Sequence, residues 1–205
     1  MFKKLFLTVI VIFTSTLVNQ TLAQNSILLL GDSLSASYGM KQNEGWVALL
    51  NKQLAKENAP YSIINASISG ETTEGGLARL PAILAKGEYD YLLIELGGND
   101  GLRGFPPNLI KKNLLQMINL AKNNDVQVLL SNVRIPPNYG PRYSQMFADV
   151  FTATAKQTNT PLLPFFVEKI ALNPDYMQAD GIHPTKEAQP LLAQQMKEYL
   201  DQYVK

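Results

Sequence analysis

Apolar residues fall in short runs along the chain, and most runs are flanked by glycine, proline or asparagine. Apolar runs of about four to eight residues between turn formers are typical of β-strands, and runs without polar alternation are typical of parallel strands buried on both faces. The sequence therefore predicts five parallel strands, at residues 27–30, 61–66, 91–96, 126–133 and 162–166.

Between these runs, apolar positions recur every three or four residues, which is the spacing of an amphipathic helix. Leu77, Leu80 and Leu84 show this spacing in one segment. Strands and helices that alternate along the chain indicate an open α/β sheet with helices on both faces. Ligands bind beyond the carboxyl ends of the strands in such sheets. Five helices are expected, at residues 46–57, 73–86, 109–122, 143–157 and 186–203.

The amino-acid composition excludes several classes of function and of binding partner. The 205 residues are 46% hydrophobic and 17% charged, which fits one globular domain. A net charge of +1 favours neither nucleic acid nor an anionic membrane surface as a partner. Without cysteine there are no disulfides, thiolate nucleophiles or cysteine-ligated zinc, and the single histidine, His183, limits any metal site to carboxylates. We expect no metal and no other cofactor. The sequence does not determine the oligomeric state, and a monomer is favoured.

The first 23 residues have the pattern of a secretory signal peptide. Lys3 and Lys4 precede an uncharged, mostly apolar run at 5–18, and Thr21-Leu22-Ala23 ends in a small residue that signal peptidase accepts. The alternative is a membrane anchor, but this run is shorter than the roughly 20 residues that span a bilayer. We expect cleavage near Gln24, export to the periplasm or the exterior, one mature domain over 24–205, and no membrane anchor thereafter.

Polar groups follow three predicted strands and precede the last predicted helix. Ser33, Gly70 and Asn99 follow the first, second and third strands, and Asp180 and His183 lie in the late loop. Taken singly, Ser33 and Asn99 suit turns, and the late loop suits the cap of a helix beginning at a proline. Because the carboxyl ends of parallel strands lie at one edge of the sheet, these residues could share a single crevice.

In combination, these residues fit a serine hydrolase. A hydroxyl needs a base to become a nucleophile, histidine is the side chain suited to that task near neutral pH, and His183 is the only one present. Asp180, three residues earlier, is placed to accept a hydrogen bond from Nδ1 and hold Nε2 toward Ser33. The N–H groups of Ser33 and Gly70, with the side-chain amide of Asn99, could stabilise the oxyanion of a tetrahedral intermediate.

Four blocks of the sequence resemble those of the SGNH (GDSL) hydrolases. They occur in the family's order: Gly31-Asp32-Ser33-Leu34, Gly70, Gly98-Asn99-Asp100 and Asp180-x-x-His183. Further similarity, at 65–70, 76–81, 95–105, 138–140 and 180–184, is to the exported bacterial thioesterases and lysophospholipases of this family, and covers nearly the whole mature chain.

The resemblance implies a flavodoxin-like three-layer α/β/α sandwich with Ser33 as the nucleophile. It implies that Asp180 and His183 complete the triad, and that Ser33, Gly70 and Asn99 form the oxyanion hole. One departure is Ser37, where many relatives have glycine in the turn after the nucleophile.

The expected activity is hydrolysis of acyl esters and thioesters, with lysophospholipids, acyl-coenzyme A and aryl esters as candidate substrates. Two alternatives are a carbohydrate O-acetyl esterase of the same fold and an exported binding module without turnover, although no triad member is missing.

Several loop residues are apolar and favour a longer acyl chain, unless they only pack their loops onto the sheet. They are Leu102, Phe105, Ile135, Pro136 and Tyr139. Three arginines could attract a substrate phosphate or simply be solvated: Arg103, Arg134 and Arg142.

Overall fold

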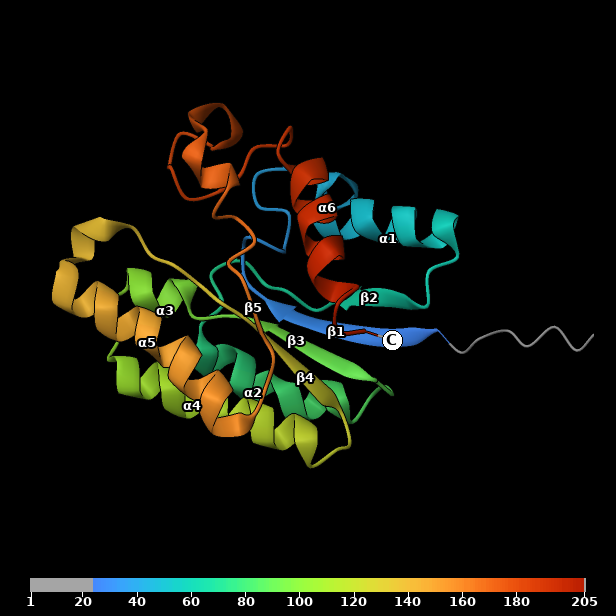
Figure 1. Cartoon of the computed structure of the whole chain (residues 1–205), viewed down its shortest axis with the longest axis horizontal. Helices are drawn as coiled ribbons and strands as arrows, with labels where there is room; N and C mark the ends of the chain where they lie inside the picture. Colours follow the sequence, from blue (N-terminus) through green and yellow to red (C-terminus); the bar gives the residue numbers. More distant parts are fainter. Residues whose placement is uncertain (1–23, 205) are drawn as a thin grey trace, which may run out of the picture.

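The computed structural model describes residues 24–204, so the expected signal peptide lies outside the described residues. A five-stranded parallel sheet forms the centre, in the order β2-β1-β3-β4-β5 (Figure 1). The predicted parallel sheet is confirmed, and its order is that of flavodoxin-like folds. The strands are β1 (Asn25–Gly31), β2 (Tyr61–Asn65), β3 (Tyr91–Glu95), β4 (Gln127–Ser131) and β5 (Leu162–Leu163).

Helices cover both faces of the sheet, as predicted. One face carries α1 (Trp46–Glu57) and α6 (Gln189–Leu200). The other carries α2 (Thr73–Leu84), α4 (Pro107–Lys122) and α5 (Pro141–Thr158) (Figure 1).

Successive residues of β1 point to opposite faces of the sheet and so belong to two different cores. Ile27 and Leu29 pack in the core beneath α1 and α6, and Leu28 and Leu30 pack in the core on the other side. All four side chains are fully buried. The unbroken apolar run at this position is therefore explained by burial of the strand on both faces.

The structure corrects the expected end of the last strand, the expected start of the last helix and the expected form of the segment after β3. The last strand has only two residues, because Pro164 follows Leu163 and has no N–H to continue the ladder. The last helix begins at Gln189 and not at residue 186, because the preceding segment is held in an antiparallel bridge between Met177 and Pro184. The glycine-rich segment after β3 forms a short helix, α3 (Gly98–Leu102), where a turn was expected.

The strand order places a switch point beside β1. The chain passes from β1 to β2 on one side, and then crosses to β3 on the other side of β1. The connections after β1 and β3 therefore diverge, which opens a crevice at their carboxyl ends. Within the described part of the chain, no helix combines the length and the apolar character needed to cross a membrane.

Candidate active site

Ser33 lies in a tight turn at the carboxyl end of β1. The carbonyl of Asp32 accepts the N–H groups of Ser35 at 3.2 Å and Ala36 at 2.9 Å, so the chain turns directly after the strand. The indole N–H of Trp46, at the start of α1, donates to the carbonyl of Leu34 at 3.1 Å. These bonds fix the backbone on both sides of Ser33 and hold its side chain at the edge of the crevice.

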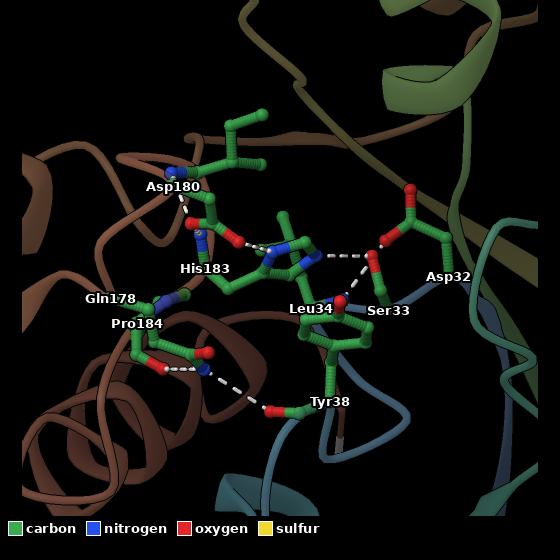
Figure 2. A network of polar contacts seen from close by, with 9 residues as sticks. Asp32, Ser33, Leu34, Tyr38, Gln178, Asp180, His183 and Pro184 are labelled. Carbon is green, nitrogen blue, oxygen red and sulfur yellow. Dashed lines mark hydrogen bonds and ion pairs between the residues drawn. The ribbon is translucent and has the colours of Figure 1, made fainter.

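His183 joins Ser33 and Asp180 in one line of hydrogen bonds (Figure 2). Nε2 of His183 lies 2.8 Å from Oγ of Ser33, and Nδ1 lies 2.7 Å from Oδ2 of Asp180. The other oxygen of Asp180 accepts the backbone N–H groups of Ile182 at 2.9 Å and His183 at 3.0 Å. The structure therefore brings together the three residues expected to form a triad.

Asp180 has the electrostatics of a residue that stabilises a cation. Partial burial raises its pKa, but hydrogen bonds from the backbone and ring of His183 and from the N–H of Ile182 outweigh this and lower the pKa to about 2. The carboxylate is thus ionised at neutral pH. It can hold the imidazole with Nδ1 protonated, which leaves Nε2 as an acceptor for the hydroxyl proton of Ser33.

Tyr38 and Gln178 support this arrangement, and no motif in the sequence points to either residue. The Tyr38 ring stacks on the His183 ring with centroids 4.1 Å apart (Figure 2). The Gln178 amide donates to the carbonyls of Tyr38 at 3.2 Å and Pro184 at 3.1 Å, so it joins the two loops. Ser37, just before Tyr38, has φ +61°, a left-handed conformation that glycine adopts most easily. This conformation fits the glycine that the family resemblance implies at this position.

The expected oxyanion donors other than Ser33 have different surroundings. Asn99 lies in α3, where its side-chain amide donates to Oδ2 of Asp32 at 3.0 Å. Gly70 lies in the turn after β2 with φ +79°, and its carbonyl accepts a hydrogen bond from Arg103 at 3.1 Å. The N–H groups of Ser33 and Gly70 are not hydrogen-bonded to any group among residues 24–204. Both N–H groups are therefore free to bind a substrate oxygen.

A mostly apolar cavity of about 350 Å³ opens beside Ser33, Asn99 and His183. Its first wall includes three of the five residues that the sequence suggested for an acyl chain, Leu102, Ile135 and Pro136. The second wall was missed by the sequence analysis, because it is built from an irregular segment without a periodic apolar pattern. It contains Phe165, Val167, Ala171, Met177 and Ile182.

Phe105, Tyr139 and Gly70 are not among the residues that line this cavity. The Tyr139 hydroxyl instead donates to the carbonyl of Leu102 at 2.8 Å, and the Phe105 carbonyl accepts the hydroxyl of Tyr143 at 2.7 Å. These contacts join the segment between β4 and the first turn of α5 to the segment from the end of α3 to Phe105. Tyr139 and Phe105 therefore connect these two segments and do not line the cavity.

The three arginines have different surroundings. Arg134 lines the cavity and forms an ion pair with Glu168 at 3.0 Å, which links the two walls. Arg103 is engaged with Gly70, and Arg142 lies at a separate surface hollow beside Tyr139. Within residues 24–204, no group of three histidine or carboxylate side chains is placed to hold a metal ion.

Comparison with known proteins matches residues 29–190 to the GDSL-like lipase/acylhydrolase family. The chain belongs to this family. The esterase TesA of Pseudomonas aeruginosa is 50% identical over 176 residues, which cover 86% of this chain and 88% of that protein. The thioesterase 1/protease 1/lysophospholipase L1 of Escherichia coli K12 is 45% identical over 193 residues, or 94% of this chain and 91% of that protein.

A solved structure of an esterase has the same fold. The psychrotrophic esterase EstA from Pseudoalteromonas sp., in a form inhibited by monoethylphosphonate, superposes with a TM-score of 0.87 at 46% identity. The match covers 88% of this chain and 99% of that one. The family resemblance and the fold class inferred from the sequence are thus confirmed.

Proposed function

We propose that this protein hydrolyses acyl esters and thioesters through a covalent acyl-enzyme on Ser33. The observation that carries the proposal is the line of hydrogen bonds from Ser33 through His183 to Asp180, at 2.8 and 2.7 Å. Two relatives support ester and thioester hydrolysis as the reaction. One is named an esterase and is 50% identical, and the other is named a thioesterase, protease and lysophospholipase and is 45% identical.

In the first half-reaction, Oγ of Ser33 attacks the acyl carbon while Nε2 of His183 takes its proton. The carbonyl oxygen becomes an oxyanion, and the N–H groups of Ser33 and Gly70 with the amide of Asn99 are the proposed donors to it. Asp180 stabilises the imidazolium that forms. The bond to the leaving oxygen or sulfur then breaks, and His183 delivers its proton to the leaving group.

In the second half-reaction, water replaces the leaving group. His183 takes a proton from the water, which attacks the acyl carbon of the Ser33 ester and forms a second oxyanion in the same place. Collapse of this intermediate breaks the bond to Oγ, releases the carboxylic acid and returns the proton to Ser33. The cycle needs no metal and no cofactor.

The cavity supports an acyl group longer than acetyl. Its lining beside Ser33 is mostly apolar and includes Ile135, Met177 and Ile182. Each buried methylene contributes up to about 0.8 kcal/mol to binding. Lysophospholipids, acyl-coenzyme A and aryl esters are the proposed substrate classes. A carbohydrate O-acetyl esterase would instead need polar groups to bind the sugar beside a small acetyl hole.

A substrate panel tests this proposal. The purified protein is assayed with p-nitrophenyl esters and acyl thioesters from acetyl to palmitoyl, with Ser33→Ala as the control. We expect turnover of both ester and thioester, faster for medium acyl chains than for acetyl, and none in Ser33→Ala. A strict preference for acetyl groups would favour the O-acetyl esterase, and no turnover of any ester would favour a binding module.

We also propose that the chain is exported to the periplasm or the exterior after loss of residues 1–23. The support is the sequence pattern of Lys3 and Lys4, the apolar run at 5–18 and the small residue Ala23. The test is N-terminal sequencing of the protein isolated from bacterial fractions. We expect a chain beginning near Gln24 outside the cytoplasm, and an intact Met1 in the membrane fraction would overturn the proposal.

A further inference from the structure

Asp32, the residue before the proposed nucleophile, carries a buried carboxylate that the mechanism above does not use. Its side chain is 3% exposed. Oδ1 accepts the N–H of Leu34 at 3.0 Å, and Oδ2 accepts the side-chain amide of Asn99, also at 3.0 Å. Gly98 makes room for this contact, because a Cβ at that position would lie 3.2 Å from Oδ2. The backbone is thus shaped to let the carboxylate reach Asn99.

Burial of the Asp32 carboxylate is unfavourable because it removes the charged group from water. Burial raises the pKa of Asp32 to about 6, and the hydrogen bonds from Leu34 and Asn99 and the proximity of His183 only partly offset that rise. Asp100 nearby raises it further. Burial also raises the pKa of its neighbour Glu95, which lies under the same turn and accepts the hydroxyl of Ser35 at 2.8 Å. With a pKa of about 6, the Asp32 carboxylate is mostly ionised at neutral pH.

An ionised carboxylate can only accept hydrogen bonds, whereas an asparagine amide has a donor end and an acceptor end. Asp32 therefore requires Asn99 to turn its NH₂ group, and not its oxygen, toward the base of the crevice. One N–H of that NH₂ group is used by Asp32. The other remains for a ligand in the cavity, which Asn99 lines together with Ser33 and His183.

We propose that Asp32 is a positioning residue that orients the Asn99 amide so that it donates a hydrogen bond to the oxyanion. This inference rests on the proposed function, since it concerns the same oxyanion. Asp32 lies at the edge of the cavity and near His183, but its carboxylate hydrogen-bonds to Asn99 and to neither Ser33 nor His183. Its place beside Ser33 in the sequence is then explained by the reach of its side chain to Asn99 in α3.

The variant Asp32→Asn changes the orientation of the Asn99 amide while it keeps the packing of the side chain at position 32. The new amide has nearly the same shape and its oxygen can still accept the N–H of Leu34. Its NH₂ group would face the NH₂ group of Asn99, so Asn99 is expected to turn and present its oxygen instead. The oxyanion then loses a donor, and kcat should fall about 10²–10³-fold with little change in KM. The melting temperature at neutral pH should not fall, because a buried charge has been removed.

A double-mutant cycle provides the decisive test. Asp32→Asn is measured in the wild-type and in the Asn99→Ala background, with kcat and KM for one p-nitrophenyl ester. We expect a large effect in the wild type and less than about a threefold further loss in Asn99→Ala, because residues that act as a unit are not additive. Ser35→Ala is the matched control, since it removes a hydrogen bond to Glu95 in the same buried cluster without touching Asn99. Its effect should be small and equal in both backgrounds.

Equal losses from Asp32→Asn in both backgrounds, or an unchanged kcat in the single variant, would overturn the inference. If Asp32→Asn does not fold, Asp32→Ser takes its place in the cycle, because serine keeps an acceptor for Leu34 but is too short to reach Asn99. The same non-additivity is expected. Failure here is distinct from failure of the proposed function, which would appear as full activity in Ser33→Ala.

Discussion

The carboxylate of Asp180 contacts His183 at two points. Oδ2 lies 2.7 Å from the ring Nδ1, and Oδ1 accepts the backbone N–H at 3.0 Å. A single side chain therefore fixes both the turn that carries the imidazole and the ring atom that holds a proton. This double contact explains how a partly exposed loop can present a base at a fixed distance from Ser33.

Asp180→Asn should preserve the turn that carries His183 but prevent Nε2 of His183 from acting as a base. The amide oxygen can still accept the backbone N–H groups, but the NH₂ group would face Nδ1 and favour the tautomer that is protonated at Nε2. We expect kcat to fall by about 10⁴-fold, as in serine hydrolase triads, with a melting temperature close to that of the wild type. Steady-state kinetics and thermal melts measure both. A loss of less than about tenfold would show that Asp180 does not set the tautomer.

The buried carboxylate of Asp32 predicts a pH-dependent stability. Its pKa is raised from 3.8 to about 6, so the folded protein binds this proton more tightly than the unfolded chain does. The contribution of Asp32 to stability is fully present below about pH 4 and is lost as pH rises through about 6. Asp32→Asn cannot ionise, so its melting temperature relative to wild type should rise between about pH 4 and pH 7. A difference that does not change with pH would contradict the raised pKa.

The two cavity walls predict a chain-length preference. Ile135 lies on the wall after β4, and Met177 lies on the wall formed by the irregular segment. Each methylene that fits between them should raise kcat/KM up to about fourfold, or about 0.8 kcal/mol, until the cavity ends. Ile135→Ala with Met177→Ala should flatten the profile and leave acetate hydrolysis nearly unchanged, because acetate does not reach these side chains.

The control for this profile is Leu191→Ala. Leu191 is also a large apolar residue, but it is 42% exposed on α6 and does not line the cavity. Its profile should match that of the wild type across p-nitrophenyl esters of increasing length. If the double variant loses acetate and long-chain turnover equally, the cavity does not bind the acyl chain.

The sequence predicted the regular part of the fold because its strands are buried on both faces. The apolar run of β1 alternates between two cores, and no polar residue interrupts it. β5 was predicted too long, since the apolar character of Phe165 and Phe166 continues past Pro164 although the ladder does not. The start of α6 was misplaced because hydrogen bonds such as Thr185 to Tyr176, at 2.8 Å, hold the preceding segment out of the helix.

The candidate site also contains some residues that the sequence predicts and others that it does not. Ser33, Asp180 and His183 could be proposed from the sequence because their residue types and order form a chemical pattern. Tyr38 and Gln178 were missed because they act through ring stacking and through bonds to backbone carbonyls, which leave no pattern in the sequence. The second cavity wall was missed for a related reason. Its position depends on the packing of residues such as Val167 against the core beneath α1 and α6.

Labelling with a fluorophosphonate tests the central claim most directly, because the reagent bonds covalently to a serine only when that serine is activated as a nucleophile. The protein is treated, digested and analysed by mass spectrometry, beside Ser33→Ala with a melting temperature checked against wild type. We predict a single adduct on the peptide containing Ser33, loss of esterase activity in step with labelling, and neither labelling nor turnover in Ser33→Ala. An adduct on another serine, or full activity in Ser33→Ala, would contradict the account.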